Sequence, residues 1–497
     1  PMTTQTHTPP HAHPSAPAPS LGADLLQSPR THSAIRALVD EVQARSAHLT
    51  GVRGPTSPAA RQSFDDAMAH AADSRGRPLL FPYLGSGLGN GALVELADGS
   101  VKWDMISGIG VHFFGHSHPA LIEAALRGAL SDTAMQGNLQ GNLDQYEFLN
   151  TLVRLAKRQS RIAHGYLATN GVMANENALK VCYQKHAAAA PGGAPRVIAF
   201  KDCFMGRSVT MSQIGDAAAN RVGIPLSTMV DYMPFYDPVT ARAMGEARYL
   251  EVTLMHLRQY VERYPKQHAC FIFELIQGEG GFNTAPREWL RALMHFCKDH
   301  GIAVWDDEIQ TFGRTDQMFA FEALDLGDYV DVLCIGKMTQ VCATLWTKDY
   351  NPGPGLLSGT FTGGGTTFKV GSKVLELLEH SDLYGEHGRA SRHHALFAHH
   401  ARALIAKHPQ WFPTPTRPLG PTVTDLVGGR AGMMRFTPFG GDKDKVMKAT
   451  KTMFDEGVIA FYCGHGPYHI RMLPVLREED WPKVFECVER GLARAAG

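Results

Sequence analysis

Short apolar runs alternate with amphipathic stretches through the middle of the chain. The segment 286–300 separates two of these runs, and its first-turn proline and the following Gly301 predict a helix. Repeated strand–helix–strand units predict a mainly parallel sheet that helices cover on both faces. The predicted strands are 165–169, 196–200, 269–274, 302–307 and 330–335.

The pattern changes on either side of this region. Residues 93–96 and 101–104 alternate as two strands around the turn residues Asp98 and Gly99. Longer helical patterns at 373–380 and 391–408 favour a second unit. We therefore predict an α/β protein, with a large domain built on the mainly parallel sheet and a smaller α+β domain from the N- and C-terminal segments. The predicted boundaries are 78–130 and 373–497 for the small domain and 131–372 for the large one.

The first 77 residues differ in composition. Residues 1–20 are rich in Pro, His, Thr and Ala and lack a secretory leader pattern, which predicts a disordered tail. A helix is expected to follow near Ser33, where Ala34, Leu38 and Val42 recur at helical intervals. Residues 1–77 are thus expected to form a tail and a helical extension.

Composition narrows the function classes. The 48 Lys and Arg residues balance 48 Asp and Glu residues, so a nucleic-acid or anionic-membrane binder is not expected. No apolar run is long enough to span a bilayer. The eight cysteines form no CxxC pair, which predicts reduced, mostly buried thiols in a cytoplasmic protein. The paired histidines at 393–394 and 399–400 are read as surface residues, and no metal site is predicted.

Ionisable residues stand at the ends of two predicted strands. Lys337 follows a buried run, so it is either a snorkelling edge residue or an amine whose lowered pKa suits covalent chemistry with a carbonyl. Asp306, Asp307 and Glu308 end the preceding strand. Because side chains alternate across a strand, Asp307 points opposite to its two neighbours, so the three cannot share one ion. One carboxylate facing a site, paired with a cation, is the better interpretation.

A third strand end offers an anion site. Gly171 and Val172 open a predicted helix at 174–185, and backbone N–H groups at a helix start bind phosphate. The dinucleotide and P-loop glycine motifs are absent from these positions. A phosphate site, a carboxylate and a lysine at successive strand ends match pyridoxal phosphate, which carries a phosphate, a pyridine nitrogen and an aldehyde.

At these residues the sequence resembles the class III (ω-amino acid) aminotransferases, which are fold-type I pyridoxal-phosphate enzymes with a seven-stranded sheet. The resemblance runs from about Pro82 to the C-terminus, and two of its segments look most like the L-lysine 6-aminotransferase branch. The matching segments are GVMANENALK (171–180), FMGRS (204–208), FELIQGEGGF (273–282), WDDEIQTFGRT (305–315), GKMTQVC (336–342), GTFTGG (359–364) and IRMLPVL (470–476).

The resemblance implies a role for each cofactor residue. Lys337 would bind the cofactor covalently and shuttle a proton, and Asp307 would pair with the pyridinium nitrogen. Gln310 would hydrogen-bond the phenolic oxygen, and Phe204 would stack on the ring. The phosphate would be held by N–H groups of Gly171 and Val172 and by Thr360 of the neighbouring subunit, because these sites form at a homodimer interface.

The resemblance also implies substrate contacts. Arg207 would bind a substrate carboxylate with its planar fork. Glu279 and Arg471 would form a switching pair, closed for a donor with a neutral or basic end and open when 2-oxoglutarate brings a second carboxylate. The alternative for each of these charged residues is a surface salt bridge.

Some positions depart from the family pattern and bear on the donor. Met205 stands where a histidine is usual, and TFGRT lacks one glycine of the common motif. The expected reaction moves the terminal amino group of L-lysine, or a similar donor, to 2-oxoglutarate. The alternatives are an ornithine, 4-aminobutyrate or polyamine aminotransferase, an aminomutase or epimerase, and a degenerate binding protein without activity.

Overall fold

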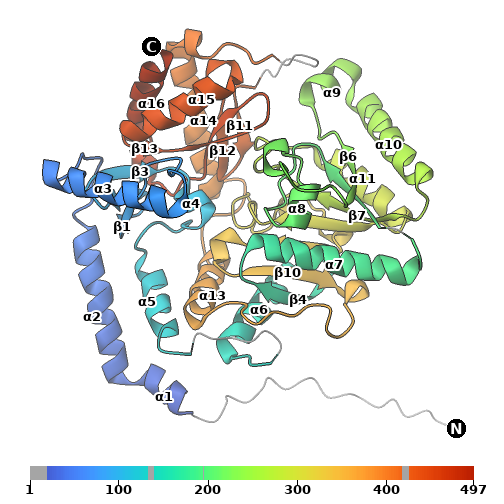
Figure 1. Cartoon of the computed structure of the whole chain (residues 1–497), viewed down its shortest axis with the longest axis horizontal. Helices are drawn as coiled ribbons and strands as arrows, with labels where there is room; N and C mark the ends of the chain where they lie inside the picture. Colours follow the sequence, from blue (N-terminus) through green and yellow to red (C-terminus); the bar gives the residue numbers. More distant parts are fainter. Residues whose placement is uncertain (1–19, 133–138, 194, 417–424) are drawn as a thin grey trace.

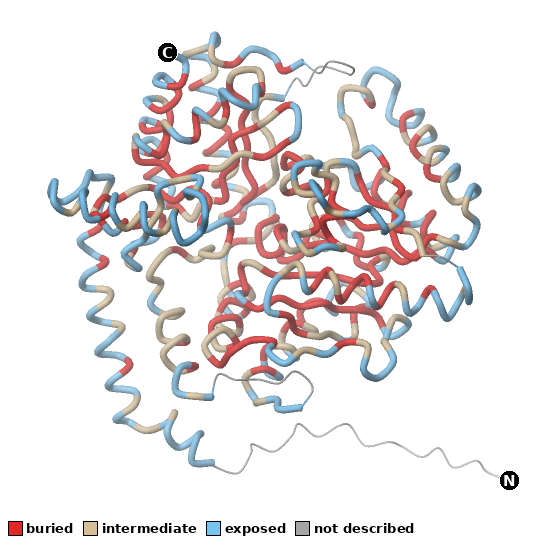
Figure 2. The backbone as a smooth tube through the Cα atoms, viewed as in Figure 1, coloured by how far each residue is buried: buried red, intermediate tan, exposed pale blue. Residues whose placement is uncertain are grey.

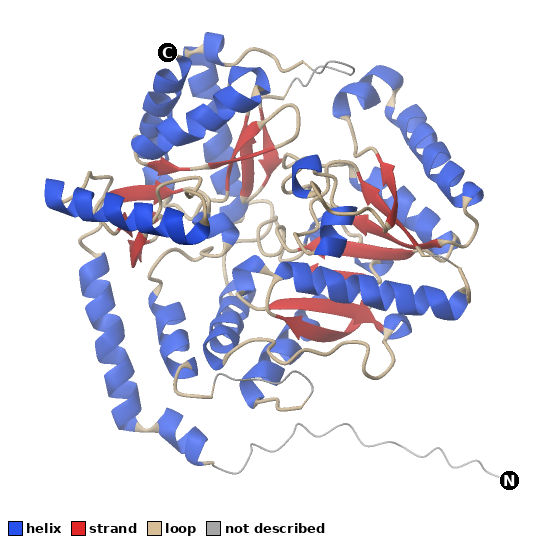
Figure 3. Ribbon diagram, in the orientation of Figure 1, coloured by secondary structure: helices blue, strands red, loops and turns tan. Residues whose placement is uncertain are grey.

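The computed structural model describes residues 20–132, 139–193, 195–416 and 425–497. The predicted tail, apart from Ser20, lies outside these ranges. Ser20 caps the first helix, accepting a hydrogen bond from Ala23 N at 3.2 Å. Figures 1 and 3 show α1 and α2 standing along one side of the molecule, followed by α3. Their bounds are α1 Leu21–Gln27, α2 Pro29–Ser46 and α3 Pro58–Arg75.

A seven-stranded sheet forms the centre of the molecule (Figure 3). Its order is β4-β10-β9-β8-β7-β5-β6, and every neighbouring pair is parallel except those that β10 makes. The predicted mainly parallel sheet is therefore confirmed. The bounds are β4 Ile162–Ala168, β5 Arg196–Phe200, β6 Met229–Met233, β7 His268–Phe273, β8 Ala303–Glu308, β9 Val332–Ile335 and β10 Cys342–Thr347.

Helices cover both faces of this sheet, because its strands are apolar on both sides. On β7, Phe271 and Phe273 enter one hydrophobic cluster, whereas Cys270 and Ile272 enter the cluster on the other face. Figure 2 shows the resulting buried layer. The helices of this region are α6 Leu143–Ala156, α7 Gly171–Ala189, α8 Val209–Ile214, α9 Pro238–Met244, α10 Glu246–Arg263, α11 Arg287–Asp299, α12 Ala320–Ala323 and α13 Gly365–Glu379.

Two four-stranded sheets lie beside the large one. The predicted hairpin is confirmed as β2 and β3, which pair antiparallel in the sheet β1-β2-β3-β13. The other sheet has the order β11-β12-β15-β14, and a further hydrophobic cluster packs these sheets against helices. The strands are β1 Gly85–Asn90, β2 Leu93–Leu96, β3 Val101–Asp104, β11 Val427–Arg430, β12 Met433–Phe436, β13 Val458–Ile459, β14 Phe461–Cys463 and β15 His469–Met472.

The remaining helices belong to this second region or join it to the large sheet. The C-terminal helices come from late in the sequence, whereas β1–β3 come from early in it, and Figure 1 shows them side by side. The division at residues 78, 131 and 373 stays a prediction. The bounds are α4 Ser107–Gly110, α5 Pro119–Gly128, α14 Arg389–Lys407, α15 Lys443–Asp455 and α16 Trp481–Ala496.

Within the described residues, none of the helices combines the length and the apolar character needed to cross a membrane. All eight cysteines are buried and unpaired, as predicted.

Candidate active site

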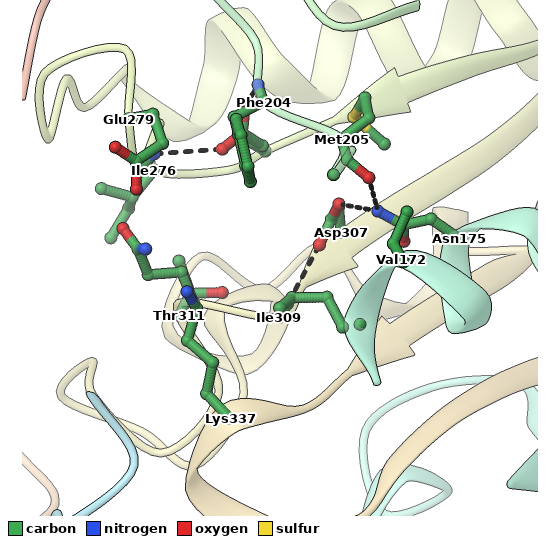
Figure 4. Close-up of a pocket in the computed structure, with 15 residues that line it drawn as sticks. Val172, Asn175, Phe204, Met205, Ile276, Glu279, Asp307, Ile309, Thr311 and Lys337 are labelled. Carbon is green, nitrogen blue, oxygen red and sulfur yellow. Dashed lines mark hydrogen bonds between the residues drawn. The ribbon is translucent and has the colours of Figure 1, made fainter. Parts of the chain in front are cut away.

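The neighbouring strands β9, β8 and β7 end at one edge of the large sheet, and a cavity of about 220 Å³ lies there. Parallel strands bring their carboxyl ends together, so Lys337, Asp307 and Glu274 meet in this cavity although they are far apart in sequence. Figure 4 shows the arrangement. The lining residues are Gly171, Val172, Asn175, Phe204, Met205, Gly206, Glu274, Ile276, Gly278, Glu279, Asp307, Ile309, Gln310, Thr311 and Lys337.

Asp307 faces the cavity from β8. Its Oδ2 accepts a hydrogen bond from Asn175 Nδ2 at 2.8 Å, and its Oδ1 accepts one from Ile309 N at 3.0 Å. Burial raises the pKa of Asp307 to about 6, although both hydrogen bonds and the nearby Lys337 favour the charged form. The carboxylate is thus fixed in orientation and lacks a strong cationic partner among the described residues.

Asp306 and Glu308 lie on the opposite side of β8 from Asp307, as strand alternation predicts. Both are fully buried, and Glu308 accepts hydrogen bonds from Ala320 N at 2.8 Å and Phe321 N at 3.0 Å at the start of α12. Burial raises the pKa of both carboxyls. These two residues therefore serve the packing behind the sheet, and the three acids do not share one ion.

Lys337 follows β9 at the cavity wall. Its backbone φ of 51° lies in the left-handed region, which is strained for a side chain of this size. Burial, followed by the Arg471 charge, lowers the pKa of Lys337 from 10.5 to about 8. A lysine with such a pKa is partly unprotonated near neutral pH and can react as a nucleophile.

The N-terminus of α7 borders the cavity. Asn170 caps the helix, its side chain accepting a hydrogen bond from Met173 N at 2.9 Å. Gly171 and Val172 occupy the first turn, where backbone N–H groups have no partner within the helix. Both residues line the cavity, so this turn offers donors and a positive helix end to an anion.

Glu274 supports the opposite wall. One of its oxygens accepts a hydrogen bond from Phe204 N and the other from Gly278 N, each at 3.1 Å. Burial and the neighbouring Asp307 raise the pKa of Glu274 to about 8. Glu274 thereby fixes the backbone at Phe204 and at Gly278.

Arg471 enters the site from β15, in the sheet beside the large one. Its Nη2 contacts Glu279 Oε1 at 2.7 Å, and its Nη1 donates to Gln310 Oε1 at 3.3 Å. Although burial opposes ionisation of Glu279, the guanidinium of Arg471 holds the pKa of that carboxyl below its usual value. The predicted pair of Glu279 and Arg471 is therefore in contact.

Two of the predicted site residues, Arg207 and Thr360, lie outside the cavity. Both are exposed, and neither lines the cavity. Conversely, Asn175 and Glu274 line it although no role was predicted for them. The position of Asn175, one turn beyond Gly171 on the same helix, is the sequence signal that could have identified it.

A model of the class III aminotransferase family matches residues 86–489 of this sequence. The chain belongs to the class III aminotransferases. A 2-aminoadipate transaminase of Pseudomonas putida is 28% identical over 424 residues, covering 81% of this chain and 92% of the relative. A diaminobutyrate–2-oxoglutarate transaminase of Wolinella succinogenes is 30% identical over 334 residues, covering 64% of this chain and 73% of the relative.

Solved structures give the same fold. The lysine aminotransferase from Mycobacterium tuberculosis superimposes with a TM-score of 0.73 at 22% sequence identity, covering 86% of this chain and 99% of that one. At this identity the likeness shows the fold alone. The family and fold predicted from the sequence are confirmed.

Class III aminotransferases use pyridoxal phosphate, and the residues of this cavity fit it. Asp307 offers a buried carboxylate to a pyridinium nitrogen, Lys337 offers an amine, and the first turn of α7 offers N–H donors to a phosphate. The buried Asn175 Oδ1 has no hydrogen-bond partner within the described residues. When bound, the cofactor supplies an aldehyde that condenses with amines and a ring that withdraws electrons.

Proposed function

We propose that this aminotransferase moves the terminal amino group of L-lysine, or of a similar amino donor, to 2-oxoglutarate by a ping-pong mechanism. The products are a semialdehyde and L-glutamate. Support comes from the contact between Glu279 and Arg471 at 2.7 Å, beside the cavity that holds Lys337.

Each cofactor residue has a proposed task. Asp307 holds a proton on the pyridine nitrogen, Phe204 stacks on the ring, and Gln310 donates its side-chain amide to the phenolic oxygen. The N–H groups of Gly171 and Val172 bind the phosphate. Lys337 Nζ takes the proton from the donor carbon that bears the amino group, for which its lowered pKa suits it.

The acceptor and the donor share one pocket through Glu279 and Arg471. With a basic or neutral donor end, Glu279 neutralises the buried guanidinium of Arg471. When 2-oxoglutarate enters, Glu279 moves away and its place on Arg471 is taken by the distal carboxylate. Arg207 is exposed, but it directly follows Gly206, which lines the cavity, so we propose that its side chain turns toward the cavity and binds the other carboxylate of the substrate.

The site is completed by a second copy of the chain. Thr360 lies outside the cavity of its own subunit, on an exposed segment next to Phe361, whose side chain is 53% exposed. An exposed phenylalanine beside a hydroxyl suits a subunit contact, so Thr360 is proposed to reach the phosphate of the partner's site.

The visible absorption spectrum of the purified holoenzyme tests this function. L-lysine is added without a keto acid, then 2-oxoglutarate follows, and the products are identified. The donor panel also includes L-ornithine, 2,4-diaminobutyrate, 4-aminobutyrate and 2-aminoadipate, because relatives named for diaminobutyrate and 2-aminoadipate match this chain. The Lys337→Met variant is the control for covalent cofactor binding.

We expect lysine to bleach the cofactor band and 2-oxoglutarate to restore it while glutamate forms. If the cofactor band does not change with lysine but changes with another donor, that donor replaces lysine in the proposal. A band that responds to amines and is restored only by a monocarboxylic keto acid would contradict the proposed acceptor.

A further inference from the structure

Arg314 is a fully buried arginine in the turn that follows β8, and this turn also carries Gln310 and Thr311 of the cavity lining. Its Nη1 donates to the backbone carbonyl of Gln310 at 2.8 Å, and its backbone N donates to the carbonyl of Thr311 at 2.9 Å. Arg314 itself does not line the cavity. It is therefore connected to the site through the backbone of this turn.

The guanidinium of Arg314 is buried without an anionic partner. Burial lowers its pKa well below the usual value, and among the described residues no carboxylate offsets this effect. Its Nε and Nη2 have no hydrogen-bond partner in the described part of the chain. A buried, unpaired cation is costly, and an apolar side chain of similar length would avoid that cost. The hydrogen bond to Gln310 is the contact of this side chain that bears on the site.

A strained segment packs against Arg314. All four residues of α4, Ser107–Gly110, have positive φ, and this conformation is rare for the β-branched Ile109. At Gly110 the backbone approaches Arg314 so closely that a Cβ would lie 2.5 Å from Nη2. The ring centre of Phe113 lies 5.8 Å from Cζ of Arg314, within the range of a cation–π contact. The guanidinium is thus confined by backbone and by an aromatic ring.

The same segment is tied to the small sheet that carries Arg471. The hydroxyl of Ser107 donates to the carbonyl of Leu473, the residue that follows β15. Arg471 on β15 donates to the side-chain Oε1 of Gln310 at 3.3 Å. Gln310 is therefore held twice, at its backbone by Arg314 and at its side chain by Arg471.

These two contacts differ in what the proposed reaction demands of them. Arg471 is proposed to exchange Glu279 for a substrate carboxylate, so its contact with Gln310 has to adjust at each exchange. Arg314 is fully buried and lies outside the cavity lining, so substrate does not compete for its contact. The backbone of Gln310 is thus secured by a group that the exchange leaves in place.

We infer that Arg314 is a positioning residue, which fixes the backbone of Gln310 so that the side-chain amide reaches the phenolic oxygen of the cofactor. This inference rests on the proposed function, because that contact of Gln310 is itself proposed. Arg314 acts through Gln310, so its loss should resemble a partial loss of the Gln310 side chain.

A double-mutant cycle tests this role. Arg314→Met removes the guanidinium but keeps an unbranched side chain, Gln310→Ala removes the amide, and a third variant combines both. The readouts are the Kd of pyridoxal phosphate for the cofactor-free full chain, from tryptophan fluorescence, and the absorbance maximum of the holoenzyme. Arg430→Gln is the matched control, because Arg430 contacts Asp316 at 2.6 Å, two residues after Arg314, and lies outside the cavity lining.

The conditions have to exclude a second route by which Arg314 could act. Burial is the main cause of the lowered pKa of Lys337, and the charges of Arg471 and Arg314 add to it. The titrations are therefore made at about pH 9, above the Lys337 pKa of about 8, where the lysine is mostly uncharged. A change in Kd then reports on Gln310 rather than on the charge of Lys337.

We expect Arg314→Met to raise the Kd about fivefold, the equivalent of one lost hydrogen bond. The absorbance maximum should shift in the same direction as in Gln310→Ala. In the Gln310→Ala background, Arg314→Met should change the Kd by less than about twofold. Arg314→Lys keeps the charge and a donor, so it should recover part of the affinity. Arg430→Gln should lower thermal stability without changing either readout.

An unchanged Kd and absorbance maximum in Arg314→Met would overturn the inference, and so would the same loss of affinity with and without the Gln310 side chain. If Arg314→Met does not fold, Arg314→Lys decides. An ammonium lacks the planar shape that packs on Gly110, so this variant must still raise the Kd, and only when the Gln310 side chain is present. Failure of the proposed function looks different, because Gln310→Ala alone would then leave both readouts unchanged.

Discussion

Asn175 ties Asp307 to the opposite wall of the cofactor cavity. Its side-chain nitrogen donates both to Asp307 Oδ2 at 2.8 Å and to the carbonyl of Met205 at 2.9 Å. One amide thus links α7, β8 and the segment that carries Phe204. The orientation of the proposed pyridinium partner therefore depends on a residue that is not itself charged.

Replacing Asn175 by Leu should reduce kcat about tenfold and shift its pH dependence. In the wild type, the hydrogen bond from Asn175 favours the charged carboxylate of Asp307. Without it, the pKa of Asp307 should rise, and the acidic limb of the kcat profile should move about one pH unit upward. Asn177→Leu, on the same helix but outside the cavity, is the control. An unchanged acidic limb in Asn175→Leu would show that this amide does not tune Asp307.

Replacing Lys337 by Met should abolish transamination and stabilise the cofactor-free protein. Burial lowers the pKa of Lys337 from 10.5 to about 8, so carrying its charge costs about 3 kcal/mol of unfolding free energy near neutral pH. This cost is fully present below about pH 8 and disappears as the pH rises to 10.5. Urea unfolding at several pH values should show the advantage of the variant shrinking over that range. A variant less stable than the wild type at pH 7 would contradict the assigned cost.

Replacing Glu279 by Gln should separate the two half-reactions. Arg471 then keeps its charge without a carboxylate partner, so a donor with a basic end should lose about tenfold in kcat/KM through like-charge repulsion. The KM for 2-oxoglutarate should fall or stay unchanged, because no glutamate has to be displaced. Each half-reaction is followed separately by the cofactor absorbance. Glu376→Gln, which removes an exposed ion pair with Lys373, is the control. Equal effects on donor and acceptor would rule out the switch.

Thr360 and Lys337 offer a complementation test of the dimer. Thr360→Ala should weaken cofactor binding about tenfold or more, since a hydrogen bond to a charged phosphate is lost. If Thr360 acts across the interface, a hybrid of Thr360→Ala and Lys337→Met subunits contains one intact site and one doubly defective site. Co-expression should then restore up to half of the wild-type activity per hybrid dimer. The assay is run at a cofactor concentration at which the Thr360→Ala homodimer is largely inactive. If Thr360 acts within its own subunit, the hybrid contains no intact site, and its activity should not exceed that of the Thr360→Ala homodimer.

The sequence was sufficient to place the central residues of the site. Lys337 and Asp307 follow apolar runs, and the rule that parallel strands end at one edge brings such residues together. Strand alternation alone separated Asp307 from Asp306 and Glu308.

Residues that act through long-range contacts could not be placed in this way. Asn175 and Asp307 are 132 residues apart in the sequence, and no local sequence pattern predicts the contact between them. The strands β6 and β10 were not predicted. In β10, polar residues such as Thr344 and Thr347 interrupt the apolar pattern on which the prediction relied. The exposed positions of Arg207 and Thr360 depend on loop geometry, which residue spacing does not determine.

The alternation of β8 has a consequence for mutations that alter the length of this strand. Asp307 is held by hydrogen bonds from Asn175 and Ile309 that favour its charge, whereas Asp306 and Glu308 lie on the other face, where burial raises the pKa of both carboxyls. Inserting or deleting one residue would exchange these environments, turning two acids toward the cofactor and one toward the hydrophobic layer. Sequence changes in β8 should therefore be confined to substitutions, and related chains should preserve the spacing between Ala303 and Glu308 even where the residues differ.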